Sequence, residues 1–143
     1  MPDADEISVE DEAYLFRRIH PEQIVKDQNS GLCRPSSAAF KNPELSVDAE
    51  PLLHAQGLDW RSSLRDNRTY SLVRFHAGTA REVGQEVVHK PVEGNEAHCE
   101  VIGKKTPSVA KALSAASEWV RIGEKGTGAD DCGIPAGVAT EYE

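Results

Sequence analysis

The sequence has few of the residues that fix a fold by covalent cross-links. Its 143 residues include three cysteines, one methionine and 6% aromatic residues. The three cysteines, Cys33, Cys99 and Cys132, are an odd and sparse set, which fits a reducing compartment better than a disulfide framework. We therefore expect a cytoplasmic protein that does not depend on disulfides.

Long apolar segments are also absent. No apolar run approaches the roughly 18–20 residues that a membrane-spanning helix needs. The first residues, MPDADEISVEDEAY, lack the basic segment followed by an apolar segment that defines a secretory signal. The length is sufficient for one domain with a real core. These features predict a single soluble domain with no membrane partner.

Negative charge is concentrated at the two ends of the chain, whose net charge is −8. Residues 1–12 carry six acids and no base, residues 123–143 carry five acids and one lysine, and the 15 bases and 13 acids between them nearly cancel. Acidic, aperiodic tails are usually solvated and poorly ordered. We expect a disordered acidic N-terminus (1–12), one domain (13–123) and an acidic Gly-rich tail (124–143) that could instead shield a basic patch.

Alternation of apolar and polar residues predicts several short strands. Tyr14 and Phe16 share one side of the first strand, which ends at His20-Pro21. Further strands are expected over 70–76, 85–90 and 97–102, with helices over 49–56 and 80–84. Because regular βαβ units are absent, the pattern predicts an α+β fold with a small, mostly antiparallel sheet packed by a C-terminal amphipathic helix.

The C-terminal helix has the clearest pattern. Thr106 is suited to cap it and Pro107 to begin it. Apolar residues recur at three- and four-residue spacing and predict a buried stripe that continues to Gly123: Val109, Ala112, Leu113, Ala116, Trp119 and Val120. Residues 32–47, with two prolines and three serines, are interpreted as a connecting segment, and Asp48 as the cap of helix 49–56.

Three histidines, His76, His89 and His98, lie in three of the predicted strands. If the strands are neighbours, the imidazoles could meet in a transition-metal site, since neutral imidazole is a good ligand. The alternatives are an acid–base role for one histidine and locally hydrogen-bonded strand histidines. No HExxH or CxxC motif supports the metal site, so we expect no metal.

Arginines provide the candidate binding site. Arg17, Arg74 and Arg81 would form an anion pocket if they converge, because guanidinium groups bind carboxylate and phosphate in bidentate fashion. Arg74 and His76 are two residues apart and share the polar face of a regular strand. We therefore predict a site beside Arg17 with Arg74, His76 and either Ser36 or Ser37. The alternative is ordinary surface ion pairing.

Sequence motifs of common enzyme classes are missing. Ser36 and Ser37 lie in no GxSxG or SxxK nucleophile motif, and the chain has no GxGxxG or GxxxxGK[ST] phosphate loop. Its aromatic residues are not interleaved with a basic stripe, so nucleic-acid binding is not indicated. We expect no bound cofactor.

The segments LFRRIHP, RPSSAAF and LSVD resemble the start of the RES-type ADP-ribosyl toxins, which open with an arginine on a first strand and a small-residue segment. The resemblance implies that Arg17 would hold NAD phosphates and that Ser36 or Ser37 would approach the nicotinamide. The family's catalytic glutamate and second-strand tyrosine have no assigned counterparts in this chain.

Taken with the missing motifs, these patterns predict a small cytoplasmic accessory or interaction protein without catalysis of its own. Its partner would be a protein or a small anionic ligand. Two alternatives stay open: a NAD-consuming ADP-ribosyl-type transferase or toxin that uses Arg17, and a histidine-based metal site.

Overall fold

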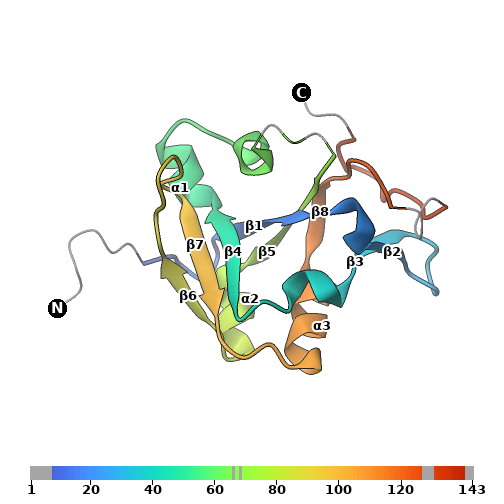
Figure 1. The fold of residues 1–143 in the computed structure, drawn as a ribbon, viewed down its shortest axis with the longest axis horizontal. Coiled ribbons are helices and arrows are strands. Elements are labelled where there is room, and N and C mark those ends of the chain that lie inside the picture. Colours follow the sequence, from blue (N-terminus) through green and yellow to red (C-terminus); the bar gives the residue numbers. More distant parts are fainter. Residues whose placement is uncertain (1–7, 66, 68, 127–130, 141–143) are drawn as a thin grey trace.

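A six-stranded sheet forms the centre of the computed structural model, which describes residues 8–65, 67, 69–126 and 131–140 (Figure 1). The strands lie in the order β6-β7-β4-β1-β5-β8, and each neighbouring pair is antiparallel. Their bounds are β1 (Tyr14–Ile19), β4 (Glu44–Ala49), β5 (Ser71–His76), β6 (Glu86–His89), β7 (His98–Ile102) and β8 (Glu118–Arg121). A separate antiparallel pair joins β2 (Ile24–Lys26) to β3 (Cys33–Pro35). The predicted α+β class with a mostly antiparallel sheet is confirmed.

Helical segments lie on both faces of the sheet, as Figure 1 shows. The three α-helices are α1 (Glu50–Ala55), α2 (Ala77–Glu82) and α3 (Pro107–Ala116), and the 3-10 turns are η1 (Pro21–Gln23), η2 (Ser37–Phe40) and η3 (Trp60–Leu64). None of the helices in the described residues has the length and apolar character needed to cross a bilayer.

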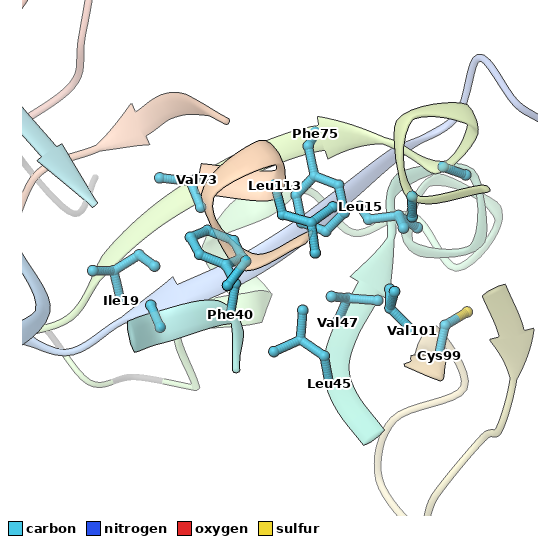
Figure 2. Close-up of a cluster of buried hydrophobic side chains, with 14 of the residues drawn as sticks. Leu15, Ile19, Phe40, Leu45, Val47, Val73, Phe75, Cys99, Val101 and Leu113 are labelled. Carbon is cyan, nitrogen blue, oxygen red and sulfur yellow. The ribbon is translucent and has the colours of Figure 1, made fainter. Parts of the chain in front are cut away.

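Because successive side chains of a strand point to opposite faces, the sheet carries two cores. Leu15 and Ile19 of β1 face the larger core, where Phe40, Phe75 and Leu113 are also fully buried (Figure 2). Phe40 and Phe75 meet edge to face with their ring centroids 6.1 Å apart. This arrangement joins η2, β5 and α3 on one face.

Phe16 points to the opposite face, where a smaller core forms. Leu53 of α1, Leu64 of η3 and Leu72 of β5 pack there with Phe16. Each of these side chains is at most 3% exposed. The smaller core fixes η3 against the sheet and therefore sets the position of the residues that follow Leu64.

The last helix is shorter than the sequence pattern predicts. α3 ends at Ala116, Ser117 is extended (φ −75°, ψ 140°), and Glu118–Arg121 forms β8 against β5. The indole N–H of Trp119 donates to the carbonyl of Cys33 at 2.9 Å. Strand pairing and this contact override a weak helical preference, so the predicted extension of the helical stripe through Val120 is wrong.

The described parts of both chain ends contact the body. Val9 is 5% exposed and belongs to the larger core, and Arg81 pairs with Asp11 at 2.6 Å. In the tail, the N–H of Ile122 donates to the carbonyl of Ala139 at 2.8 Å, and Val138 packs against the larger core. These residues therefore lie against the body, whereas disorder of the two tails stays a prediction. The rest of the two tails lies outside the described residues.

Cys33 and Cys132 form a disulfide, whereas Cys99 is a buried free thiol. The N–H of Cys33 donates to the carbonyl of Gly133 at 2.7 Å, which aligns the tail with β3. The expectation of a chain without disulfides is therefore wrong. The two cysteines are 99 residues apart, and a single sequence gives no sign of a pairing at that separation.

Candidate anion-binding site

The two central strands β1 and β4 separate soon after they pair. Their register contains only Leu15↔Ala49 and Phe16↔Asp48, although each strand has six residues. A cleft of about 240 Å³ opens beyond the Phe16↔Asp48 pair. We call it the basic cleft and define it by six of its lining residues: Arg17, Arg18, Asp48, Ser63, Arg65 and His98.

Arg17 occupies the gap between the separating strands. Its Nε donates to the carbonyl of Ala39 at 3.2 Å, and its Nη1 donates to the carbonyl of Ser46 at 3.2 Å. Burial lowers the pKa of the Arg17 guanidinium, and the positive charge of Arg18 lowers the same pKa further. An arginine still remains protonated at neutral pH. Since a guanidinium has five N–H donors, Arg17 keeps donors for an anion in the cleft.

Two more arginines line the cleft, of which Arg18 leaves β1 on the face opposite Arg17. Arg18 is exposed, and its guanidinium carbon lies 5.5 Å from the ring centroid of Tyr70. Arg65 ends η3 in the left-handed conformation (φ 54°), which is uncommon for a residue other than glycine. Such backbone strain is often found at ligand-binding positions.

Apart from the buried Arg121, the described arginines sort into two groups. Four of them pair with a carboxylate: Arg34 with Asp27, Arg61 with Asp59, Arg74 with Glu118 and Arg81 with Asp11. Arg17, Arg18 and Arg65 have no carboxylate within 4.0 Å among the described residues, and all three line the basic cleft. The unneutralised arginines are therefore gathered at one place in a chain of net charge −8.

Ser63 adds a buried hydroxyl to the same cleft. It is 2% exposed, and its Oγ has no hydrogen-bond partner among the described residues. An unsatisfied buried polar group costs about 1–3 kcal/mol, so it is uncommon without a reason. The Ser63 Oγ has less than 1 Å² of accessible area, so a ligand oxygen would reach it only after a local side-chain shift.

Asp48 and His98 also line the cleft, as cross-strand neighbours on β4 and β7. Asp48 is 9% exposed, and its Oδ1 accepts from Nδ2 of Asn95 at 2.7 Å. His98 bonds through Nδ1 to the carbonyl of Lys90 at 2.8 Å. Because a carbonyl cannot donate, Nδ1 carries the proton of the neutral ring and Nε2 is an acceptor. Asp48 lies in β4 and is not the cap of α1, contrary to the sequence prediction; the N-cap is Ala49.

The cleft contains a serine, a histidine and an aspartate, but they are not linked as a nucleophilic triad. A triad requires the serine to bond the histidine and the histidine to bond the carboxylate. Here His98 Nδ1 bonds a backbone carbonyl, Asp48 bonds Asn95, and Ser63 Oγ is unpaired among the described residues. Cys99 is no better a nucleophile, since burial and then the Asp48 charge raise the pKa of its thiol to about 12.

The predicted cluster of Arg17, Arg74 and His76 is not formed. Arg74 and His76 do share a face, and both contact Tyr14: the Arg74 guanidinium carbon lies 4.1 Å from the Tyr14 ring centroid, and the His76 ring stacks at 4.2 Å. Arg17 is aligned with Val73 and therefore points to the opposite face. Arg74 also pairs with Glu118, as the ion-pair alternative predicts.

Ser36 and Ser37 also lie away from the basic cleft. The Oγ of Ser36 caps η2 by accepting from the N–H of Ala38 at 3.2 Å. Ser37 lines a different hollow, near Cys33 and Trp119. The structure therefore brings neither serine to Arg17 in the way that the resemblance to RES-type toxins implies.

The three histidines predicted as alternative metal ligands lie apart. β5, which carries His76, is separated from β7 by β1 and β4. His89 and His98 are on neighbouring strands but bond to the carbonyls of Glu96 and Lys90. In the part of the chain that the structure describes, no three His, Cys, Asp or Glu side chains are placed to hold a metal ion.

Sequence reasoning missed most of the basic cleft. Arg65 and Ser63 belonged to a segment without periodicity, and only tertiary structure brings them to β1. Asp48 was within reach, because Leu45, Val47 and Ala49 alternate with Ser46 and Asp48 as a strand with one polar face would. Comparison with protein-family models, with curated proteins and with solved structures gives no match. The geometry of the cleft is therefore the basis for assigning a function.

Proposed function

We propose that this chain is an accessory protein without catalysis of its own, and that it acts by binding a small anionic ligand in the basic cleft. One observation carries the proposal. Apart from the buried Arg121, the three described arginines without a described carboxylate partner line one cleft, whereas the four that have such partners do not line it. A positive cleft in an acidic protein attracts anions selectively.

Two further features support an anion rather than a surface ion-pair network. Arg17 is held by two backbone carbonyls, so its position does not depend on a ligand. A preformed donor loses little entropy when a ligand arrives. Ser63, whose hydroxyl lacks a partner among the described residues, also lines the cleft.

The proposal is tested by calorimetric titration of inorganic phosphate at low ionic strength. An Arg18→Ala/Arg65→Ala variant is expected to bind phosphate at least about tenfold more weakly, since a hydrogen bond to a charged group contributes roughly 1.5–3 kcal/mol. Arg17 is left intact because it also bridges β1, β4 and η2. The same binding is expected to weaken as salt is added.

An Arg34→Ala/Lys111→Ala variant is the matched control. Both side chains are exposed and line the hollow near Trp119, so the variant removes two positive charges without touching the basic cleft. It is expected to retain phosphate binding. Equal losses in the two variants would mean that net charge, and not the cleft, determines binding.

A transferase that consumes NAD is the second function to test. Arg17 lines the cleft, but the seryl groups that would approach the nicotinamide do not. Incubation of the protein with NAD and measurement of free nicotinamide is expected to show no turnover. Release of nicotinamide that disappears in an Arg17→Ala variant would establish the enzyme instead.

A cytoplasmic location remains a prediction. It rested on the sparse cysteines, and the disulfide between Cys33 and Cys132 weakens that basis because such bonds persist mainly in oxidising compartments. Acid quenching of intact cells, followed by alkylation of the free thiols in denaturant and mass spectrometry, distinguishes the two cases. A reducing compartment gives three alkylated cysteines, and an oxidising one leaves Cys33 and Cys132 protected.

A further inference from the structure

The basic cleft has two walls of opposite character. Arg17, Arg18 and Arg65 line it from β1 and the end of η3, with Arg17 leaving β1 on the face opposite Arg18, and Asp48 and His98 line it from β4 and β7. A ligand that is only an anion would satisfy the first wall and bring its charge near the Asp48 carboxylate. Asp48 and His98 therefore favour a different chemical group on the ligand.

Asp48 presents acceptor capacity that the described residues do not use. Its carboxylate is 9% exposed and receives one hydrogen bond from a described residue, from Asn95 Nδ2 to Oδ1. Two carboxylate oxygens together offer about four acceptor positions. A carboxylate that is removed from water is costly unless donors surround it, so a donor from a ligand would be favoured here.

His98 contributes a second acceptor beside Asp48. The two residues are register partners on β7 and β4, so their side chains leave the sheet on the same face. With Nδ1 bonded to the Lys90 carbonyl, the neutral imidazole leaves its Nε2 lone pair free to accept. Asp48 and His98 together form an acceptor wall suited to an ammonium group.

The opposite wall favours phosphate over carboxylate. Three guanidinium groups supply more donors and more charge than one carboxylate can use. A phosphomonoester carries a charge of about −1.5 to −2 at neutral pH and three acceptor oxygens. Its geometry and charge match the arginine wall better.

We infer that the basic cleft binds a small phosphomonoester that also carries an amino group, with the phosphate on Arg17, Arg18 and Arg65 and the ammonium on Asp48 and His98. This inference rests on the proposed anion-binding function. The cleft volume of about 240 Å³ suits a ligand of a few heavy atoms rather than a nucleotide.

The test compares O-phosphoethanolamine with ethyl phosphate on the wild-type protein by calorimetry. The two compounds differ only in the ammonium group. Net charge alone favours ethyl phosphate, because the ammonium cancels one negative charge of phosphoethanolamine. The inference predicts the reverse order, with phosphoethanolamine bound at least about tenfold more tightly, as expected for one charged hydrogen bond.

An Asp48→Asn variant is expected to remove the advantage of phosphoethanolamine and to leave ethyl phosphate binding unchanged or stronger. Circular dichroism and thermal melting check that the variant folds. If it does not, the order of the two ligands on the wild-type protein still decides the matter. Vesicles of phosphatidylethanolamine, in which the phosphate is a diester, are expected to bind no more protein than phosphatidylcholine vesicles.

The possible outcomes distinguish the inferred amino phosphate ligand from the proposed anion-binding function. If ethyl phosphate binds as tightly as phosphoethanolamine and its binding depends on Arg18 and Arg65, the ligand needs no amino group. The anion site is then supported, and the further inference is refuted. Absence of binding for both compounds overturns the inference and the proposed function together. Binding to phosphatidylethanolamine vesicles without binding of the free monoester would refute the small-molecule ligand.

Discussion

Removal of the Cys33–Cys132 disulfide tests how the tail contributes to stability. The perturbation is a Cys33→Ala/Cys132→Ala variant, which keeps the buried thiol of Cys99. Both sulfurs are buried, with Cys33 3% and Cys132 4% exposed, so alanine fills most of each site. The main change is therefore the lost cross-link rather than lost packing.

The separation of the two cysteines sets the expected magnitude. They are 99 positions apart, so the bond closes most of the chain into one loop. In the chain-entropy description, a cross-link that closes a loop of about 100 residues lowers the entropy of the unfolded chain by the equivalent of about 4.7 kcal/mol at 25 °C. Domains of this size are stable by only about 5–15 kcal/mol. The variant is expected to fold but to lose a large part of its free energy of unfolding.

Denaturant unfolding followed by tryptophan fluorescence measures this loss. Trp119 is a suitable reporter because its indole bonds the carbonyl of Cys33. Reductant is expected to destabilise the wild type by a similar amount and to leave the double variant unchanged. A difference below about 1 kcal/mol between wild type and variant would refute the argument from unfolded-state entropy.

Three further predictions concern the core, the free thiol and the tail. Leu113→Ala is expected to lower the free energy of unfolding by about 2–5 kcal/mol, because Leu113 is fully buried. Lys111→Ala, on the exposed side of α3, should change it by less than about 0.5 kcal/mol. Equal losses for the two variants in denaturant melts would mean that the face of α3 assigned to the core is wrong. Cys99 should resist iodoacetamide in the folded protein at pH 9, because burial raises its pKa to about 12; since the unfolded thiol ionises near its ordinary pKa of 9.0, stability should fall more steeply above that pH in the wild type than in a Cys99→Ala variant. Truncation after Gly126 should cost at least as much stability as the double cysteine variant, because it also removes Val138 from the larger core; a truncated chain that melts at the wild-type temperature would contradict this.

The sequence predicts the fold best where the pattern is local. Strands at 71–76, 86–89 and 98–102 follow from alternation, and the start of α3 follows from Thr106 and Pro107. The strand Glu44–Ala49 was missed, although it lies in the middle of the sheet. Its neighbours in sequence are prolines and serines, which hide a strand whose partners are far away in the chain.

The candidate site was predicted only in part, for the same physical reason. Arg17 was identified because it lies within a strand, and it does line the basic cleft. Its predicted companions Arg74 and His76 were assigned from their spacing within one strand. That spacing cannot reveal that Arg17, on the neighbouring strand, is the register partner of Val73 and therefore points to the other face of the sheet. Arg65 and Ser63 reach the cleft through the packing of η3, and no local pattern encodes that contact.

The short pairing of β1 with β4 has a mechanical consequence. It divides the sheet into two halves of three strands, β6-β7-β4 and β1-β5-β8, joined by two register pairs where the other junctions have three to six. The seam is the easiest line along which the sheet can bend, and Arg17 spans it from β1 to the carbonyl of Ser46 on β4. A ligand bound between the two walls would restrict bending at this junction. Amide hydrogen exchange in β1 and β4 would then slow on binding, while exchange at the distant edge strand β8 would not.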